Sequence, residues 1–329
     1  MRVLVTGGAG YIGSVTTLEL INQGYEVVVF DNLSYGHKQA IPKQAKFIKG
    51  DLLDRSGIRS ALSREKIEAV VHFAGFIAVG ESVKEPLKYV KNNIFGGFNL
   101  LDSMMELGIN KIIFSSSAAV YGNPDKVPIK EEDKLKPTSP YGETKLIFEK
   151  FLSWCDAAYG IRSISLRYFN AAGADIENDL GEDHDPETHL IPLILKTALG
   201  QRKNIQIYGT DYDTPDGTCI RDYVHIKDLA AAHVLALKYL KKDGMSSFYN
   251  VGSSKGYSVK EVIDISRKIT SREIKVVESP RREGDPASLV ASSEKIQREL
   301  GFKFKHSGLE NIIKTAWEWH SKHPQGYKK

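Results

Sequence analysis

Cysteine is scarce in this chain. Only two cysteines, Cys155 and Cys219, occur among its 329 residues. Two isolated cysteines make neither a disulfide framework nor a zinc-type ligand spacing, so we expect no metal site. Free thiols are typical of a reducing compartment, which favours a cytoplasmic protein.

Long apolar runs are also missing. No segment reaches the roughly 18 apolar residues that a membrane-spanning helix needs. Glycines at positions 7, 8 and 10 interrupt the apolar stretch near the start, so we expect no signal peptide. The excess of one charge is small as well, because 45 Lys and Arg stand against 41 Asp and Glu, a formal net charge of +4. These charges are spread along the chain, and we therefore expect neither a nucleic-acid nor a membrane partner.

Short apolar runs alternate with helical patterns over the first two-thirds of the chain. The pattern predicts six buried strands, at residues 3–5, 26–30, 46–48, 69–73, 111–115 and 164–167. Strands that alternate with helices indicate βαβ units and a parallel sheet covered on both faces. The sequence therefore predicts an α/β, Rossmann-type doubly wound sheet, with functional residues at the carboxyl ends of its strands.

The character of the sequence changes after about residue 173. Residues 174–187 are acidic and loop-like, and short strands and helices follow. We expect a Rossmann domain over residues 1–173 and a smaller α/β domain over 174–329, a division that suits a chain of this length. Residues 222–245 are expected to pack back on the first domain. The last three residues, 327–329, are expected to be disordered.

A glycine-rich turn follows the first predicted strand. Gly7, Gly10 and Gly13 lie between that strand and a helix that runs to about Gln23. Glycines in such a turn allow a sharp bend, a close approach of backbone to a pyrophosphate, and tight packing of helix on strand. The helix N-terminus then offers free N–H groups to the phosphates. Asp31 ends the second strand, where a carboxylate binds both ribose hydroxyls and repels a 2′-phosphate, so the pattern favours NAD over NADP.

A tyrosine and a lysine share one face of a later helix. Tyr141 and Lys145 are four residues apart, and Ser139 and Pro140 before them suit a helix start. A nearby ammonium group and the helix dipole predict a lowered pKa for the tyrosine. Such a phenol can take a proton from a hydroxyl while a hydride leaves the same carbon. The serines at 115–117 end the fifth strand, where a hydroxyl can bond the reacting oxygen.

Further motifs occur in order along almost the whole chain. They are residues 31–33 (Asp-Asn-Leu), 72–75 (His-Phe-Ala-Gly), 79–82 (Val-Gly-Glu-Ser), 115–122 (Ser-Ser-Ser-Ala-Ala-Val-Tyr-Gly), 166–170 (Leu-Arg-Tyr-Phe-Asn), 221–225 (Arg-Asp-Tyr-Val-His) and 281–285 (Arg-Arg-Glu-Gly-Asp). Together with the glycine turn and the Tyr–Lys pair, they resemble the extended short-chain dehydrogenase/reductases, and among these the UDP-glucose 4-epimerases of galactose metabolism. The resemblance implies reversible interconversion of UDP-glucose and UDP-galactose through a transient 4-keto sugar. It also implies a hydride passed to and from tightly bound NAD, and a homodimer.

The resemblance also implies roles for individual residues. The implied catalytic residues are Ser117, Tyr141 and Lys145. The implied NAD-binding residues are Gly7, Gly10, Tyr11, Ile12, Gly13, Asp31, Asn32, Leu33, Ser34, Tyr35, Gly36, Asp51, Leu52, Phe73, Ala74, Gly75, Phe76, Ile77, Asn92, Ser117, Tyr141, Lys145 and Phe169. The implied UDP-sugar-binding residues are Ser117, Tyr141, Asn170, His189, Leu190, Gln206, Ile207, Tyr208, Arg221, Tyr223, Arg282, Asp285 and Leu289. Arginine suits the diphosphate because its planar fork gives paired, charge-assisted hydrogen bonds.

Three positions depart from the pattern of that family. Ile77 stands where many members carry Lys, and His189 stands where Asn is frequent. Leu289 occupies the position whose size is associated with acceptance of N-acetylhexosamines, and leucine is intermediate between the large and small residues found there. A UDP-N-acetylglucosamine/UDP-N-acetylgalactosamine 4-epimerase, or an enzyme of dual specificity, therefore stays open.

Two different classes of protein would also carry a dinucleotide turn. A sugar-nucleotide 4,6-dehydratase resembles this chain but carries an Asp-Glu pair for acid and base at the positions of Ala118 and Ala119, whose methyl groups transfer no protons. A non-catalytic NAD-sensing regulator on the same fold would not need both Tyr141 and Lys145. The sequence thus favours the epimerase over both of these classes.

Overall fold

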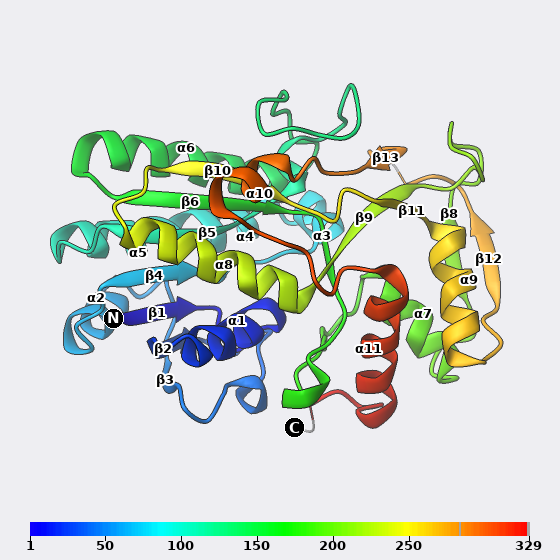
Figure 1. Ribbon diagram of the computed structural model, residues 1–329, viewed down its shortest axis with the longest axis horizontal. Coiled ribbons are helices and arrows are strands. Elements are labelled where there is room, and N and C mark those ends of the chain that lie inside the picture. The colour runs from blue at the N-terminus through cyan, green and yellow to red at the C-terminus, as the bar shows by residue number, and fades with distance from the viewer. Residues whose placement is uncertain (283, 328–329) are drawn as a thin grey trace.

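Seven parallel strands form the large sheet of the molecule (Figure 1). The computed structural model describes residues 1–282 and 284–327. In spatial order the strands are β10 (Ser247–Val251), β6 (Arg162–Tyr168), β5 (Lys111–Ser117), β4 (Ala69–His72), β1 (Arg2–Thr6), β2 (Glu26–Asp31) and β3 (Lys46–Lys49). The predicted doubly wound Rossmann-type fold and its six strands are confirmed, whereas β10 was not predicted. The winding direction reverses between β1 and β4, which places the switch point at their carboxyl ends.

Helices cover both faces of this sheet. One face carries α1 (Tyr11–Asn22) and α8 (Ile226–Lys241), and the other carries α2 (Arg55–Arg64), α5 (Gly96–Glu106) and α6 (Pro140–Tyr159). The alternation of side chains along β1 explains both cores, because Val3 and Val5 pack under the first pair of helices and Leu4 packs under the second group. All three are fully buried.

The start of α6 follows from its sequence. Ser139 caps the helix, since its Oγ accepts a hydrogen bond from the N–H of Gly142 at 3.2 Å, and Pro140 occupies the first turn. At the other end Gly160 adopts a left-handed conformation with φ of 68°. The predicted helix start is therefore confirmed, and it fixes the register of Tyr141 on α6.

A smaller part of the molecule lies beside the large sheet, at the right of Figure 1. Its core is formed mainly by α7 (Leu190–Ala198), α9 (Val259–Thr270), α11 (Leu309–Lys322), β8 (Ile205–Tyr208) and β12 (Val276–Ser279). Its four-stranded sheet comprises β7 (Asn170–Ala172), β9 (Ile220–His225), β11 (Gly256–Ser258) and β13 (Ser288–Leu289). The shorter remaining elements are η1 (Lys38–Ala40), α3 (Val79–Lys84), α4 (Pro86–Tyr89), η2 (Val90–Phe95), η3 (Ala118–Val120), η4 (Ile176–Asn178) and α10 (Glu294–Leu300).

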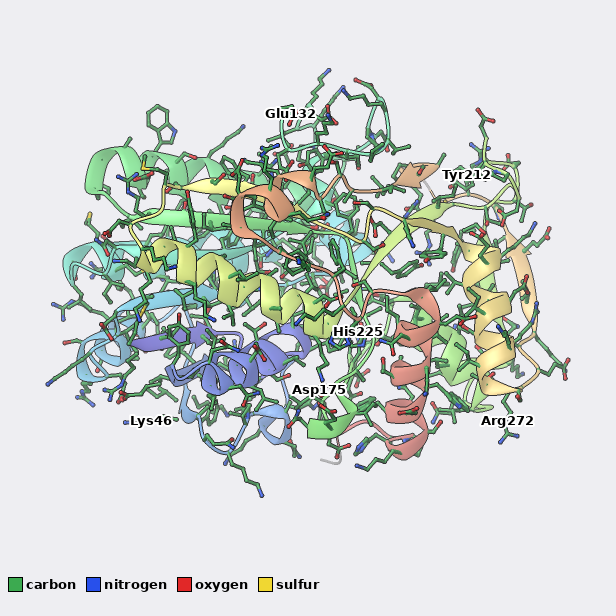
Figure 2. The ribbon with its side chains drawn as sticks, viewed as in Figure 1. Lys46, Glu132, Asp175, Tyr212, His225 and Arg272 are labelled. Atoms are coloured by element: carbon green, nitrogen blue, oxygen red, sulfur yellow. The ribbon has the colours of Figure 1, made fainter. Side chains whose placement is uncertain are left out.

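The chain passes between the two parts more than once. His225 ends β9 in the middle of the molecule, between the large sheet and α11 (Figure 2), and its backbone N–H donates to Ser307 Oγ at 2.9 Å. The next residue begins α8, which returns to the large sheet and packs on α1, β5 and β6. The division at residue 173 stays a prediction, because α8 and β10 both follow it and both belong to the layers of the large sheet.

The end of the chain is ordered as far as the structure describes it. Tyr327 is buried, its N–H donates to Asp183 at 2.8 Å, and its ring centre lies 5.3 Å from that of Trp319. The predicted disorder is therefore wrong for Tyr327, because this aromatic side chain packs beside α11. Residues 328–329 lie outside the described residues.

Among the described helices, none is both long and apolar enough to span a bilayer.

Candidate active site

The predicted cofactor residues lie at one edge of the large sheet. They follow the carboxyl ends of β1, β2, β3, β4, β5 and β6, and these ends meet at one edge because the strands are parallel. Asn92 comes from η2, beside the segment after β4. Asn32 joins two of these loops, since its Nδ2 donates to Asp51 Oδ2 at 3.0 Å. The predicted site is thus continuous in space although its residues are dispersed in sequence.

Close packing requires glycine in the turn after β1. Gly7 has a φ of +72°, and a Cβ there would lie 2.6 Å from the backbone nitrogen of Ala74. A Cβ at Gly13 would lie 2.2 Å from the carbonyl oxygen of Gly7. Helix α1 therefore starts directly against the strand end, and its N-terminus is held at the switch point of the sheet.

Asp31 is fixed beside this turn. Its carboxylate is buried, with Oδ2 accepting from the N–H of Ala9 at 3.0 Å and Oδ1 accepting from the N–H of Leu33 at 2.8 Å. Burial raises the pKa of Asp31, and these two N–H groups offset part of that rise. Each carboxylate oxygen has a second lone pair for a ligand hydroxyl. The geometry fits the ribose role that the sequence predicts for Asp31.

Asn93 holds the loop that follows β4. Its Oδ1 accepts from the N–H of Phe76 at 2.8 Å, and its Nδ2 donates to the carbonyl of Phe76 at 3.0 Å. The contact fixes residues 73–77, which are predicted to line the cofactor site. The sequence singled out the neighbouring Asn92, whose Nδ2 donates to Asn93 Oδ1 at 3.0 Å. Two adjacent asparagines give the same signal in a sequence, so only the structure separates their roles.

Three predicted catalytic side chains meet at the carboxyl end of β5. Tyr141 and Lys145 extend from the first turns of α6, and the Lys145 Nζ lies 5.8 Å from the centre of the Tyr141 ring. Ser117 is the last residue of β5 and hydrogen-bonds with Tyr141. Tyr141 and Lys145 are both buried. A polar reactive group is therefore enclosed by protein on most sides.

The pKa of Tyr141 differs from the prediction. Burial raises it above the ordinary tyrosine value, and the hydrogen bond with Ser117 offsets only part of that rise. The predicted lowering is therefore wrong for this structure. Its physical reason is burial, which Lys145 does not offset, because the Nζ donates to the carbonyl of Ser115 at 2.6 Å instead of to the phenol. Burial also lowers the pKa of Lys145 to about 8, against the charge of Glu149.

A buried ion pair supports this centre from behind. Arg167 on β6 and Glu149 on α6 lie 2.7 Å apart, and both side chains are 2% exposed. Glu149 also accepts a hydrogen bond from Ser116 Oγ, and Arg167 donates to the hydroxyl of Tyr121 at 3.0 Å. The pair was missed from the sequence, because its members stand 18 residues apart on different elements. The only hint in the sequence was Arg167, a charged residue on a strand that was predicted to be buried.

The predicted UDP residues lie mainly in the smaller part. Arg221 on β9 donates to Asp285 at 3.3 Å and to the carbonyl of Pro286 at 2.9 Å. The guanidinium of Arg282 lies 3.8 Å from the centre of the Tyr208 ring, which orients it by a cation–π contact. These contacts bring β8, β9 and the loop before β13 together. Two arginines therefore stand in the region predicted to hold a diphosphate.

The other predicted substrate residues divide into two groups. Asn170 donates to the carbonyl of Asp222 at 3.0 Å, and Leu289 packs beside Phe169 at the junction of the two parts. By contrast, Ile207 and Tyr223 are buried in the core of the smaller part. Their side chains support β8 and β9, so only backbone groups remain there for a ligand.

His189 stands at the N-terminus of α7, next to Leu190. Its Nδ1 lies 2.6 Å from Glu182 Oε1, and its side chain is 45% exposed. Two further residues, His184 and Glu187, complete a cluster around it. We call Glu182, His184, Glu187 and His189 the Glu–His cluster.

Comparison with known proteins places the chain in a family. Residues 3–252 match the NAD dependent epimerase/dehydratase family. The chain belongs to this family. A UDP-glucose 4-epimerase of Halalkalibacterium halodurans is 52% identical over 327 residues, which cover 99% of this chain and 98% of the relative.

Solved structures of epimerases have the same fold. One crystal structure of a UDP-glucose 4-epimerase has a TM-score of 0.97 and 51% identity, and the match covers 100% of both chains. The UDP-glucose 4-epimerase of Bifidobacterium longum, solved with NAD+ and UDP, has a TM-score of 0.94 and 40% identity, covering 99% of this chain and 100% of that one. The first strand, the glycine turn and the Tyr–Lys pair all lie within the part that matches the NAD dependent epimerase/dehydratase family.

The residues at the glycine turn fit the dinucleotide of this family. A Cβ at Gly10 would lie 3.3 Å from the carbonyl oxygen of Gly7, which is tighter than most Cβ contacts, so the turn leaves little room for a side chain at this position. No described side chain caps α1, and its first turn has no acidic residue, which leaves the positive end of the helix for phosphates. With Asp31 fixed beside it, the turn has the shape and charge that an NAD diphosphate and ribose need.

The epimerase/dehydratase family contains two chemistries, and the end of β5 separates them. Ala118 is buried and Ala119 follows it in η3, directly after Ser117. A dehydratase needs an acid and a base here to remove water. Two methyl groups supply neither. The site therefore fits epimerisation better than dehydration.

Proposed function

We propose that this protein catalyses the reversible 4-epimerisation of UDP-glucose and UDP-galactose through a transient 4-keto sugar, as a cytoplasmic enzyme of galactose metabolism. The observation that carries the proposal is the meeting of Ser117, Tyr141 and Lys145 beside the glycine turn. The identity of about half to curated UDP-glucose 4-epimerases supports the same substrate. In this proposal residues 1–173 mainly hold NAD and residues 174–329 mainly hold the UDP-sugar.

Tyr141 is the proposed acid–base group. Its phenol oxygen takes the proton of the 4′-hydroxyl and later returns it, and Ser117 bonds the same sugar oxygen. Lys145 supplies a buried positive charge near the phenol and fixes its orientation through the carbonyl of Ser115. NAD, when bound, supplies the acceptor and donor for the hydride of the 4′-carbon. Tyr141 acts as the base in its phenolate form, so the phenol, whose pKa burial raises, must first release its own proton, and the positive charge of Lys145 favours that form.

The smaller part supplies the proposed binding contacts to UDP. Arg221 and Arg282 are oriented by Asp285 and Tyr208, so their guanidinium groups can bind a diphosphate without first being ordered. The sugar itself must present both faces of its 4′-carbon during the reaction. Strong contacts to UDP with fewer contacts to the hexose meet this need, because they bind the substrate without fixing one orientation of the sugar.

We also infer a homodimer. Phe151 and Trp154 lie three residues apart on α6, and their side chains are 44% and 71% exposed. Phe98 of α5 contacts Phe151, with ring centres 4.6 Å apart. Exposed aromatic side chains on adjacent helices are typical of a protein–protein interface. A second copy of the chain is the occupant we propose for this face.

A stopped assay tests the proposed activity. Purified protein is incubated with UDP-galactose and no added NAD, the protein is removed, and UDP-glucose is then measured with a separate dehydrogenase step. Turnover would support both the epimerase and a retained cofactor. Absence of turnover on every UDP-hexose, even with NAD supplied, would contradict the proposal and favour the NAD-sensing regulator.

The width of the sugar pocket is a second question. Leu289 lies on β13 and packs against the cluster that contains Phe169. A medium-sized side chain at this point favours some acceptance of UDP-N-acetylglucosamine. The same assay on that substrate, with Leu289→Tyr and Leu289→Ala, tests the idea. Leu289→Tyr should lower the activity on the acetylated sugar relative to UDP-galactose, and Leu289→Ala should raise it.

A further inference from the structure

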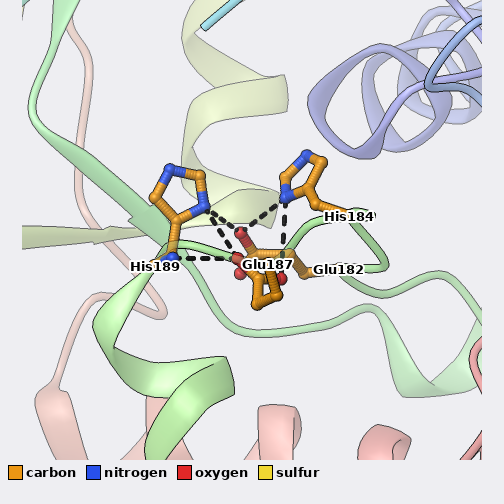
Figure 3. A group of neighbouring side chains, drawn as sticks. All are labelled: Glu182, His184, Glu187 and His189. Carbon is orange, nitrogen blue, oxygen red and sulfur yellow. Dashed lines mark hydrogen bonds and ion pairs between the residues drawn. The ribbon is translucent and has the colours of Figure 1, made fainter. Parts of the chain in front are cut away.

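The Glu–His cluster lies between the cofactor turn and the substrate part. The rings of His184 and Tyr11 have their centres 6.3 Å apart, and Tyr11 is the first residue of α1. At the other end of the cluster, His189 directly precedes α7 as its N-cap. Figure 3 shows both imidazole rings directed toward the two carboxylates. The short segment between Gly181 and Leu190 therefore gathers two imidazoles and two carboxylates where the two parts meet.

Two buried polar atoms of the cluster face each other without a hydrogen bond. His184 Nδ1 and Glu187 Oε2 are 3.7 Å apart and neither atom makes a hydrogen bond, although His184 Nδ1 also lies 3.3 Å from Glu182 Oε1. The side chain of Glu187 is 3% exposed. Its other oxygen accepts from the N–H groups of Thr188 and His189 at 2.7 and 2.9 Å, which fixes the direction of the free oxygen. A buried carboxylate oxygen with no partner is costly unless a cation meets it.

The spacing of the donor atoms fits one metal ion. All four ligand atoms lie within 4.8 Å of one another. Metal–ligand bonds of about 2.0–2.1 Å in a tetrahedral site place neighbouring ligand atoms about 3.3 Å apart. With Glu187 Oε2 as the ligand oxygen, two donor pairs are close to this value, since His184 Nδ1 lies 3.3 Å from Glu182 Oε1 and 3.7 Å from Glu187 Oε2. A third pair, His189 Nδ1 with Glu182 Oε1 at 2.6 Å, would open slightly.

We propose that the Glu–His cluster binds one divalent transition-metal ion of the Zn²⁺ kind. Two imidazole and two carboxylate ligands suit zinc better than Ca²⁺ or Mg²⁺, which prefer oxygen ligands alone. The ion fastens the 181–190 segment and so links the N-terminus of α1 to the N-terminus of α7. This is a structural site, since the four protein ligands complete a tetrahedron and leave no position for substrate. The expectation of no metal site came from cysteine spacing alone, which is silent about a ligand set of histidine and glutamate.

The carboxylates make the cluster attractive to positive charge. His184 Nδ1 lies 3.3 Å from Glu182 Oε1 and 3.7 Å from Glu187 Oε2, so two carboxylates face one imidazole nitrogen. A metal ion and a proton would compete for this nitrogen. The competing arrangement is therefore a metal-free ion-pair network, and the experiment must distinguish the two.

Metal binding by the whole protein is the first measurement. Protein stripped with dipicolinate is titrated with Zn²⁺ in a calorimeter and, separately, with Co²⁺ in a spectrophotometer. We expect about one Zn²⁺ per chain and the intense visible absorption of tetrahedral Co²⁺, which added Zn²⁺ abolishes. Excess Zn²⁺ should raise the Tm by about 5 °C. Absence of heat and only the weak spectrum of hydrated Co²⁺ would overturn the proposal in favour of the ion-pair network.

A matched pair of variants locates the ion. Glu187→Gln removes one ligand oxygen, and it should weaken Zn²⁺ binding by at least about a hundredfold. Glu177→Gln is the control, because that side chain is 82% exposed and pairs with Lys227 outside the cluster. Equal binding by wild type and Glu187→Gln would place the ion elsewhere and overturn the proposal. If Glu187→Gln does not fold, His184→Asn replaces it, and the Co²⁺ spectrum of the wild type decides independently.

Discussion

The Lys145 ammonium group donates a 2.6 Å hydrogen bond to the carbonyl of Ser115, which ties helix α6 to strand β5 behind the reacting phenol. The bond holds the lysine in a buried position, and burial lowers its pKa to about 8. Lys145 thus changes charge close to physiological pH. Its charge state should therefore be visible in the pH profile of the enzyme.

Activity should stop rising with pH at about pH 8. The phenolate of Tyr141 becomes more populated as the pH rises, because its raised pKa keeps the phenol protonated at neutral pH. Burial lowers the pKa of Lys145 to about 8, so the ammonium form is lost above that value, and we expect kcat/KM for UDP-galactose to level off there. Protein stability should rise between about pH 8 and 10.5, because the unfolded lysine binds more protons than the folded one. A kcat/KM that keeps rising to pH 9.5 would show that the ammonium charge is not needed.

Removal of one oxygen atom should stop the reaction. Tyr141→Phe keeps the buried ring but loses the group proposed to carry the proton, so kcat should fall by at least about 10³-fold. The Tm and the NAD content should stay close to those of the wild type, since the ring packing is retained. Tyr159→Phe is a suitable control, because that tyrosine is exposed at the far end of α6. Substantial turnover by Tyr141→Phe would contradict the assigned role.

Asp31 should control the retention of NAD. In the wild type, the Asp31 carboxylate accepts hydrogen bonds from the N–H groups of Ala9 and Leu33. Asp31→Asn removes its negative charge and places an amide where a ribose hydroxyl needs a hydrogen-bond acceptor. We expect NAD to bind about 10- to 100-fold more weakly. Fluorescence titration of the cofactor-free protein measures this affinity, and Glu26→Gln at the exposed start of β2 is the control. An unchanged Kd would exclude Asp31 from the cofactor site.

Gly13 should tolerate no side chain. In Gly13→Ala the new Cβ would lie 2.2 Å from the carbonyl oxygen of Gly7. That oxygen belongs to the backbone, so it cannot move aside as the end of a flexible side chain could. We expect a loss of about 1–3 kcal/mol in the free energy of unfolding, measured by urea denaturation, together with loss of NAD. Gly80→Ala is the matched control, because a Cβ there meets no described atom within 4 Å and alanine favours helix α3. Equal stability of the two variants would contradict the close packing of the turn.

The exposed aromatic face of α6 should hold two copies together. Trp154→Glu places a charge in the proposed interface, and sedimentation should then show a monomer instead of a dimer. Val277→Glu in β12 is the control, since that side chain is also exposed but belongs to the smaller part. If the wild type sediments as a monomer, or if Trp154→Glu still sediments as a dimer, this face of α6 is not the dimer interface.

The sequence predicted the layers of the fold because their signals are local. Strand runs such as Val3–Val5 and the helix start at Ser139 are determined by neighbours along the chain, and both occur in the structure. Strand β10 escaped prediction because its five residues, with Asn250 among them, belong to the sheet only through pairing with β6. That pairing joins segments distant in sequence, for which no local pattern exists.

As with the fold, part of the candidate site could be predicted from the sequence and part could not. Tyr141 and Lys145 were singled out from their spacing and place in the chain, Ser117 was implied by the family resemblance, and the structure brings the three together. The direction of the Tyr141 pKa was wrong, because the sequence shows the nearby charge but not the burial that outweighs it. The Arg167–Glu149 pair was likewise beyond sequence reasoning, since a buried ion pair is defined only by the packing of two elements.

The return of the chain through α8 and β10 has a consequence for how the protein can be divided. A fragment that ends at residue 173 would lose the helix that covers β5 and β6 and the strand that pairs with β6. It would expose an apolar sheet face and an unpaired strand edge, both of which favour aggregation. Residues 1–173 therefore do not form a unit that could be moved to another protein, and insertion or fusion is tolerable only at surface loops that leave both chain crossings intact.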